Sequence, residues 1–437
     1  MDIKDIKAIK GSILHFFGNP ELTDSRKAYE YFENGVLIVE NGHISLTGPY
    51  DELKQSIPDD AEIHDYSGKL ILPGFIDTHL HYPQTDIIAS YGKQLMEWLE
   101  KYTFPREGKF ENSEYAESVA EFFLDELLRN GTTTAQVMST VHMHSADILF
   151  RKSWERNLSM ITGKVMMDRN APEYLLDDPI RGYEESLELI HRWHEKDRLL
   201  YAVTPRFAIT STEEQLKKSA ELLDAAPNLY LHTHLSENKD EIAFVAELFP
   251  WSKDYLDVYD KFGLVTRRST YAHSIHLSNQ NFKQMAEKKA SIAFCPTSNL
   301  FIGSGLFNLR KPVSAGVKVG IGTDIGGGTS FSILRTLGEA YKVLQLRGQS
   351  LSPLKAFYLA TQGGAESLCL DDKIGNFKTG KEADFIVLNL DSTPLIKRRM
   401  EYTDGIDERL FILMMLGDDR SIEATYVMGQ KVFSTDH

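Results

Sequence analysis

Residues 70–81 read LILPGFIDTHLH, an apolar run that closes on two histidines. The run predicts a buried strand over Leu70–Asp77. Successive side chains of a strand point to opposite faces, so residues i and i+2 share one face. His79 and His81, at the end of this strand, can therefore reach the same point in space.

Strand-like segments recur between residues 132 and 323, with helical patterns in most of the gaps. Glu114–Arg129 and Thr212–Ala225 are two of these helical patterns. Such alternation predicts a parallel sheet with crossover helices. Together with Leu70–Asp77 the strands make a set of eight, which predicts a (β/α)8 barrel with its active site at the carboxyl ends of the strands. The other expected strands are Thr132–Met138, Met160–Met166, Leu199–Val203, Tyr230–His234, Thr270–His273, Ser291–Phe294 and Lys318–Thr323.

Both ends of the chain differ in character from this middle part. Residues 31–50 are β-rich and carry Asn-Gly pairs, a hairpin signal, and residues 375–390 and 424–433 read as short strands joined by glycine turns. We expect the two ends to fold together, although two unrelated β-appendages are the alternative. The predicted fold is α/β, a (β/α)8 TIM-type barrel with a small β-sandwich domain built from both termini, with the bounds 1–69, 70–372 and 373–437.

The composition narrows the class of protein. The chain has 437 residues, 42% apolar and 25% charged, as in an ordinary soluble globular protein. A net charge of −15 argues against non-specific nucleic-acid binding, which needs basic patches. Cys295 and Cys369 are too few for a disulfide framework or a cysteine-rich zinc site. With no signal-peptide pattern and no apolar run long enough to cross a membrane, we expect a cytoplasmic protein.

The ends of the predicted strands carry a candidate metal site. His234 closes the fifth strand and Asp324 follows the eighth, so both can join His79 and His81 on one face of the barrel. Catalytic zinc sites use three or four nitrogen and oxygen ligands and keep a position open for water. A lone His-x-His pair is as easily two ordinary strand histidines, but four such residues at three strand ends predict a metal site. We expect one zinc ion per chain, with iron as the alternative because it also accepts imidazole and carboxylate.

We also interpret the other notable residues near these strand ends. Glu237 suits a general acid or base beside a metal-bound water, or simply a helix N-terminus. We interpret His232 and His276 as supporting residues, and the His142–His144 pair as structural because no acidic partner accompanies it. Residues 326–328 are glycines without the phosphate-loop pattern, and we interpret them as backbone that permits a close approach. We interpret Cys295 as a buried small residue.

Taken together, the motifs resemble the guanine deaminases of the amidohydrolase superfamily, and the similarity spans nearly the whole chain. The first and last metal motifs are shared by many amidohydrolases, whereas the Tyr-Pro-Gln, Pro-Arg-Phe and Asn-Leu-Phe segments are more specific. The segments that carry the resemblance are Pro73–His81, Tyr82–Gln84, Trp98–Pro105, Thr204–Phe207, His234–Asn238, Cys295–Leu300, Phe301–Phe307, Gly322–Gly328 and Leu416–Arg420.

The resemblance implies a role for each site residue. The zinc ligands would be His79, His81, His234 and Asp324, and His273 would be either catalytic or a distant fifth ligand. Gln84, Arg206 and Phe207 fall where the family binds the purine. His81, His234, Glu237 and Asp324 would also border the substrate. The fourth strand ends in Val203–Arg206 without the lysine of binuclear relatives, which favours one metal.

The reaction implied is hydrolytic deamination of guanine to xanthine and ammonia by a zinc-bound hydroxide, in purine catabolism or salvage. Asp324 would orient the water and accept its proton, and Glu237 would protonate the ring nitrogen. The family also implies a homodimer. One alternative is an amidohydrolase acting on a related ring, such as 8-oxoguanine, a thio-adenosine, cytosine or a triazine. The other is a barrel scaffold without catalysis.

Overall fold

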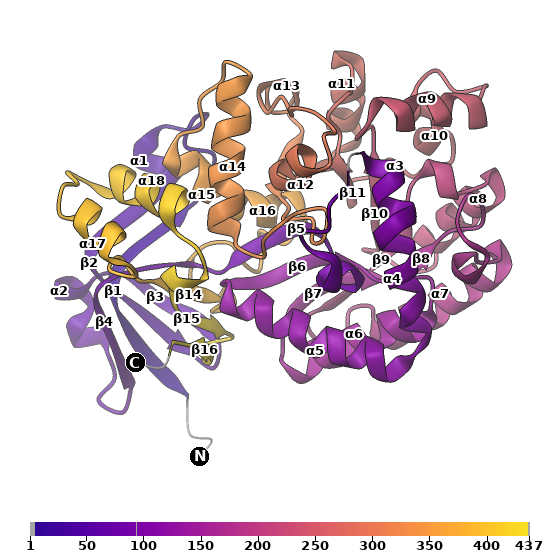
Figure 1. Cartoon of the computed structure of the whole chain (residues 1–437). Helices are drawn as coiled ribbons and strands as arrows, with labels where there is room; N and C mark the ends of the chain where they lie inside the picture. Colours follow the sequence, from indigo (N-terminus) through magenta and orange to yellow (C-terminus); the bar gives the residue numbers. More distant parts are fainter. Residues whose placement is uncertain (1–4, 93, 436–437) are drawn as a thin grey trace.

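The computed structural model describes residues 5–92 and 94–435. Figure 1 shows two parts: a barrel surrounded by helices, and a sheet at one end of the molecule. The sheet holds the first strands of the chain and also its last ones, which are indigo and yellow in the figure. The α/β fold predicted from the sequence is confirmed.

The barrel consists of parallel strands in sequential order. The hydrogen bonds that connect the first strand to the last one and to the loop that follows it include Thr78 Oγ1 to the Ile321 carbonyl (2.9 Å), Asp324 N to the His79 carbonyl (2.9 Å) and His81 N to the Ile325 carbonyl (2.7 Å). The strands are β5 (Phe75–His81), β6 (Thr132–Met138), β7 (Ser159–Gly163), β9 (Leu199–Pro205), β10 (Tyr230–Leu235), β11 (Ser269–His273), β12 (Ser291–Phe294) and β13 (Lys318–Ile321), with β8 (Val165–Met166) paired to β9.

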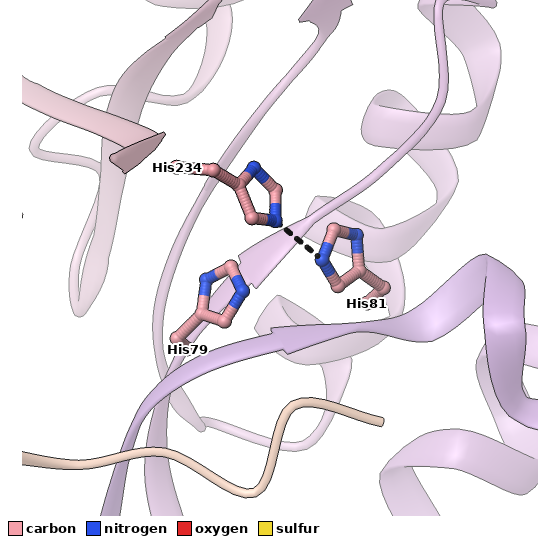
Figure 2. A group of neighbouring side chains, drawn as sticks. All are labelled: His79, His81 and His234. Carbon is pink, nitrogen blue, oxygen red and sulfur yellow. Dashed lines mark hydrogen bonds between the residues drawn. The ribbon is translucent and has the colours of Figure 1, made fainter. Parts of the chain in front are cut away.

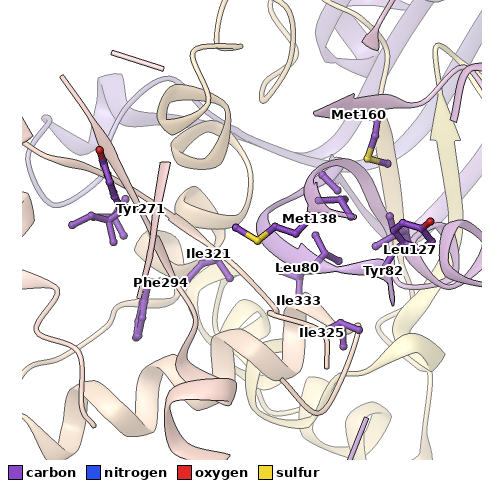
Figure 3. Close-up of a cluster of buried hydrophobic side chains, with 14 of the residues drawn as sticks. Leu80, Tyr82, Leu127, Met138, Met160, Tyr271, Phe294, Ile321, Ile325 and Ile333 are labelled. Atoms are coloured by element: carbon purple, nitrogen blue, oxygen red, sulfur yellow. The ribbon is translucent and has the colours of Figure 1, made fainter. Parts of the chain in front are cut away.

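Helices cover the outer face of the strands, and the inner faces pack against one another inside the barrel, so most strand residues are buried. Figure 3 shows part of this core, where Met138 and Ile321 of the strands lie among side chains such as Leu127 and Ile333 of the helices. These helices are α5 (Ser113–Arg129), α6 (Met143–Glu155), α7 (Pro179–Trp193), α8 (Glu213–Leu223), α9 (Lys239–Leu248), α10 (Tyr255–Lys261), α11 (Asn279–Lys288), α12 (Pro296–Phe301), α13 (Arg310–Ala315), α14 (Ile333–Leu346), α15 (Pro353–Ala360) and α16 (Gln362–Ser367).

The first predicted strand, Leu70–Asp77, is split between the two parts of the molecule. Its beginning belongs to β4 (Glu62–Pro73), which pairs with strands of the terminal sheet, and the barrel strand β5 starts only at Phe75. Gly74 lies between them, where an added Cβ would clash with the Thr133 side chain. The prediction was wrong here because an apolar run does not reveal which sheet its backbone joins. His79 and His81 consequently lie within β5.

The strands from both ends of the chain form one seven-stranded mixed sheet, which confirms the prediction that they fold together. The sheet curls on itself: Ile44 N donates to the Lys381 carbonyl and Gly380 N to the Ile44 carbonyl, both at 2.8 Å. Side chains from both ends, including Ile9 and Phe385, share a core inside it. In sheet order the strands are β16 (Gln430–Ser434), β15 (Ile422–Val427), β14 (Phe385–Leu388), β4, β1 (Ile6–Phe16), β2 (Tyr29–Glu40) and β3 (His43–Pro49).

The remaining helices are short or lie outside the barrel wall. In the described residues, none is long and apolar enough to cross a membrane. Cys295 is buried and Cys369 half-buried, and both are free thiols. The helices that are short or lie outside the barrel wall are α1 (Ser25–Ala28), α2 (Tyr50–Leu53), α3 (Leu95–Trp98), α4 (Phe104–Glu107), α17 (Pro394–Met400) and α18 (Ile406–Leu416).

Candidate active site

Three histidines meet at the carboxyl ends of β5 and β10. Figure 2 shows their rings pointing toward one another, with Nε2 of His81 and Nε2 of His234 at 3.2 Å. Asp324, just after β13, brings Oδ1 to 3.2 Å from His79 Nε2 and 3.5 Å from His81 Nε2. The structure thus brings together all four residues that the sequence predicted as metal ligands.

The hydrogen-bond chemistry of this cluster fits a metal ion. His234 Nδ1 lies 2.7 Å from the Arg206 carbonyl, and a carbonyl oxygen only accepts, so the hydrogen is on Nδ1 and Nε2 offers a lone pair. His79 Nε2 faces the Asp324 carboxylate and His232 Nε2 lies 2.7 Å from His79 Nδ1. A metal ion between these nitrogens and the carboxylate would satisfy the lone pairs that point there, and imidazole with carboxylate suits a first-row divalent metal.

Contacts behind these side chains set their orientation. His232 takes the supporting position expected of it, on the far side of the His79 ring. Asp77 is fully buried and accepts hydrogen bonds from His79 N (3.2 Å), Thr323 N (3.0 Å) and the Thr323 hydroxyl. Burial raises the pKa of Asp77 to about 7, although these hydrogen bonds oppose the shift. Such outer contacts fix the tautomer and direction of metal ligands.

Glu237 and His273 lie beside the candidate metal site. Glu237 Oε1 accepts from Ser304 Oγ at 2.8 Å, and its Oε2 lies 3.3 Å from His273 Nε2. His273 Nδ1 donates to Asn299 Oδ1 at 2.8 Å, and His273 Nε2 is 3.7 Å from Asp324 Oδ2. Burial raises the pKa of the Glu237 carboxyl above its usual value, more than the neighbouring His273 lowers it. A carboxyl with a raised pKa suits proton transfer near neutral pH.

The backbone at these strand ends adopts the left-handed region. Ser236, His273 and Asp324 have φ of 48°, 65° and 54°. A non-glycine residue in this region costs on the order of 1–3 kcal/mol and persists where the surrounding structure enforces it, most often at active sites. The strand ends therefore hold His273 and Asp324 in directions that a relaxed extended chain would not give them.

A pocket opens beside the candidate metal site, and His81, His234 and Asp324 border it. Gln84, Arg206 and Phe207, which the sequence predicted as purine-binding residues, all border it. The Phe207 ring lies edge-on to the His234 ring, with centroids 6.3 Å apart. The other apolar walls are Leu95, Trp98, Leu99 and Ile302.

The glycines after Asp324 permit a close approach, as expected. Gly326 N donates to Gln84 Oε1 at 3.2 Å, and an added Cβ at Gly326 would clash with the Gln84 backbone carbonyl. This loop therefore packs directly against the segment that follows β5, and Gly327 borders the pocket.

Glu107 is among the residues of the site that the sequence prediction missed. Glu107, at the end of α4, is fully buried and accepts from Arg206 Nη1 at 2.9 and 2.7 Å and from Gln84 Nε2 at 3.1 Å. No local pattern marks it, because its partners lie 23 and 99 residues away along the chain.

The other histidines singled out in the sequence, His142, His144 and His276, have structural contacts. His144 Nε2 donates to the Phe110 carbonyl at 2.7 Å, and its ring stacks on His142 with centroids 5.8 Å apart. His276 Nε2 donates to the Ser304 carbonyl at 2.9 Å and so supports the loop that holds Glu237. These positions agree with the interpretation from the sequence.

Comparison with known proteins agrees with this geometry. The profile of the Amidohydrolase family matches residues 70–432. The chain belongs to the amidohydrolase family, a family of metal-dependent hydrolases.

Within that family it belongs with the guanine deaminases. It is 52% identical to guanine deaminase of Escherichia coli over 98% of both chains, and 36% identical to that of Mus musculus over 85% of both chains. The solved structure of the E. coli guanine deaminase superposes with a TM-score of 0.95 over 99% of both chains. Guanine deaminase from C. acetobutylicum, solved with guanine bound in its active site, gives 0.88 at 31% identity, over 98% of this chain and all of that one.

Proposed function

We propose that this enzyme hydrolyses guanine to xanthine and ammonia, using one zinc ion held by His79, His81, His234 and Asp324. The observation that carries the proposal is the composition of the pocket. Three of the candidate metal ligands, His81, His234 and Asp324, border it together with the buried acid Glu237 and the side chains of Arg206 and Gln84. Full-length similarity to guanine deaminases, one of them with guanine bound, supports the same reaction.

Zinc in this ligand set would supply a water whose pKa is lowered to about 7 and which is therefore nucleophilic at neutral pH. The donor set supports zinc because it combines imidazole nitrogens with one carboxylate and leaves the pocket side open.

Asp324 orients the attacking water and accepts its proton. Burial alone would raise the pKa of Asp324, but the neighbouring His79 and His273 lower it overall, which favours the carboxylate form. The water oxygen adds to C2 of guanine, the carbon that bears the exocyclic amine. His273 Nε2 faces the carboxylates of Glu237 and Asp324. It lies where it can contact the oxygen that adds to C2.

Glu237 delivers the proton that the ring needs. In its protonated form it gives a proton to the ring nitrogen next to C2, so negative charge does not build up in the ring. The proton that Asp324 took from the water then passes to the exocyclic nitrogen, which leaves as ammonia. As the C2 carbonyl forms, the added hydroxyl gives its proton to Glu237, which returns to its protonated form. Water is consumed and ammonia released, so the products are xanthine and one ammonia per guanine.

Arg206 and Gln84 hold the opposite edge of the base, and Phe207 packs against its face. A flat purine with polar edges fits a pocket that has aromatic walls and a few placed hydrogen-bonding groups. Arg206 favours a carbonyl oxygen at position 6, which guanine has and adenine lacks.

A substrate panel tests the proposed reaction. Guanine, adenine, cytosine and 8-oxoguanine are each mixed with the purified enzyme, with and without a chelator, and ammonia release is followed. We expect chelator-sensitive turnover of guanine and much slower turnover of the others. Turnover of another ring in preference to guanine would overturn the substrate, and no turnover by the zinc-loaded protein would favour the scaffold alternative.

We further propose a cytoplasmic homodimer, as the family resemblance implies. The two free thiols support a reducing compartment. Sedimentation of the purified enzyme should give twice the chain mass, and a single chain mass would contradict the dimer.

A further inference from the structure

We propose that Glu107 is a positioning residue that fixes the side chains of Gln84 and Arg206, and thereby determines which edge of a purine the pocket accepts. The inference rests on the proposed function, because it concerns how the substrate is selected. Among the described residues, Gln84 and Arg206 border the pocket, whereas Glu107 lies behind them.

The surroundings of Glu107 determine its charge. Its side chain is fully buried, and the Arg206 side chain is 3% exposed. Arg206 Nη1 donates to both carboxylate oxygens, at 2.9 and 2.7 Å. An arginine is always protonated, and a buried cation without its counter-ion is strongly disfavoured, so the pair keeps Glu107 ionised.

An ionised carboxylate only accepts hydrogen bonds, and this fixes the orientation of the Gln84 amide. Gln84 must turn its NH2 group toward Glu107, with Nε2 at 3.1 Å from Oε1. On the other side, the backbone N–H of Gly326 donates to Gln84 Oε1 at 3.2 Å. Both contacts favour the same orientation of the Gln84 amide. In the reversed orientation the amide oxygen would face the Glu107 carboxylate, and the NH2 group would face the Gly326 N–H.

The remaining hydrogens of these two side chains then form the polar wall of the pocket. Among the described residues, Arg206 uses Nη1 for its side-chain hydrogen bonds, so Nε and Nη2 stay available. Gln84 keeps its second amide hydrogen. The wall therefore presents N–H donors, which match a carbonyl at purine position 6 and oppose an amino group there. A site built to hydrogen-bond one group rejects the analogue lacking it by large factors.

The chain brings Glu107 to this place through the segment that follows β5. The Phe104 ring, three residues earlier, lies 5.8 Å from the Arg206 guanidinium, and Trp98 and Leu99 of the same segment border the pocket. The Glu107 carboxylate thus connects α4 with Gln84, just after β5, and with Arg206, just after β9.

The substitution Glu107→Gln tests the proposal. It keeps the shape but removes the charge, and its amide can donate to Gln84 and let that amide reverse. Hypoxanthine and adenine differ at position 6 and in the hydrogen on the adjacent N1, and both lack the 2-amino group that is removed, so they serve as inhibitors of guanine turnover. We expect the KM for guanine to rise by about tenfold or more with a smaller change in kcat. The ratio of the adenine to the hypoxanthine inhibition constant should fall by about tenfold or more.

Two further variants separate a positioning role from a structural one. Glu107→Asp keeps the charge but shortens the reach, so we expect a raised KM for guanine with discrimination at position 6 retained. Arg106→Gln alters the neighbouring residue, which pairs with Asp86 on the protein surface, and should leave both quantities unchanged. Metal content and thermal stability are measured for each variant. If Glu107→Gln does not fold, the KM of Glu107→Asp for guanine is the measurement that tests the proposal.

The outcomes distinguish this inference from the proposed function. If the wild-type enzyme does not turn over guanine, the proposed function fails first. If the wild type does so and a folded, metal-loaded Glu107 variant keeps both the KM and the inhibitor ratio within about twofold of wild type, the positioning role is wrong.

Discussion

At the scale of single residues, Glu237 carries the account of proton transfer. It is buried, accepts a hydrogen bond from Ser304, and lies beside His273. Glu237→Gln keeps the shape and hydrogen-bonding capacity but cannot donate an acidic proton. We expect kcat to fall by about 10²–10⁴-fold with little change in KM, because general acid–base catalysis contributes that much. Steady-state kinetics with guanine measure the effect.

The metal content of the Glu237→Gln variant is the control, since Glu237 is not one of the proposed ligands. Normal turnover by a variant that holds its metal would show that another group moves the proton.

The sequence revealed these site residues because most of them directly follow an apolar strand. His234, Asp324 and Glu237 lie within a few residues of strand ends, and a barrel brings such positions together. Ser304 and Asn299, which hold Glu237 and His273, could not be found this way. Their partners lie 67 and 26 residues away, and a serine or asparagine in a loop has many ordinary uses.

At the scale of elements, the loop after β13 positions Gln84. The contact between Gly326 and the Gln84 backbone leaves no room for a Cβ. We expect Gly326→Ala to displace Gln84 and lower kcat/KM for guanine by about tenfold or more, since shifts near 1 Å can cost 10²-fold in rate. Steady-state kinetics test this.

Gly405→Ala is the matched control for that prediction. Its added Cβ would meet nothing within 4 Å, and its backbone is extended with a φ of 174°. It should keep full activity. Equal activity of the two variants would mean that Gly326 does not set the geometry of Gln84.

The bounds of strands were predicted well where a local sequence pattern sets them. They were predicted less well where pairing with distant strands decides which sheet a segment joins. The predicted strand Thr132–Met138 has the bounds of β6, because turns and helices delimit it. The split of residues 70–81 between β4 and β5 was not predicted, since it depends on pairing with β1 and β14 far along the chain. Glu107 was missed for the same reason.

At the scale of the whole molecule, Arg198 connects the barrel to the sheet built from both ends. It precedes β9, donates to Glu382 Oε2 at 2.9 Å and pairs with Asp384, and its side chain is 7% exposed. Arg198→Gln would leave two carboxylates without their cation. We expect the free energy of unfolding to fall by about 2–4 kcal/mol, because breaking a buried ion pair is costly.

Thermal unfolding of the Arg198→Gln variant measures the loss as a lower Tm. Arg420→Gln is the control, because its side chain is 63% exposed although it also pairs with an aspartate. An equal Tm for both variants would argue against Arg198 as the link. The domain bounds 1–69, 70–372 and 373–437 stay a proposal, and β4 shows that the sheet reaches as far as Pro73.

The central claim is that one metal ion per chain makes this barrel a guanine deaminase, and a zinc titration tests it most directly. Metal-free enzyme is mixed with increasing zinc, and the conversion of guanine to xanthine is followed together with ammonia release. We predict no turnover without metal and a linear rise in turnover that ends at one zinc per chain. Turnover by the metal-free protein, or a fully zinc-loaded protein that leaves guanine unchanged, would contradict it.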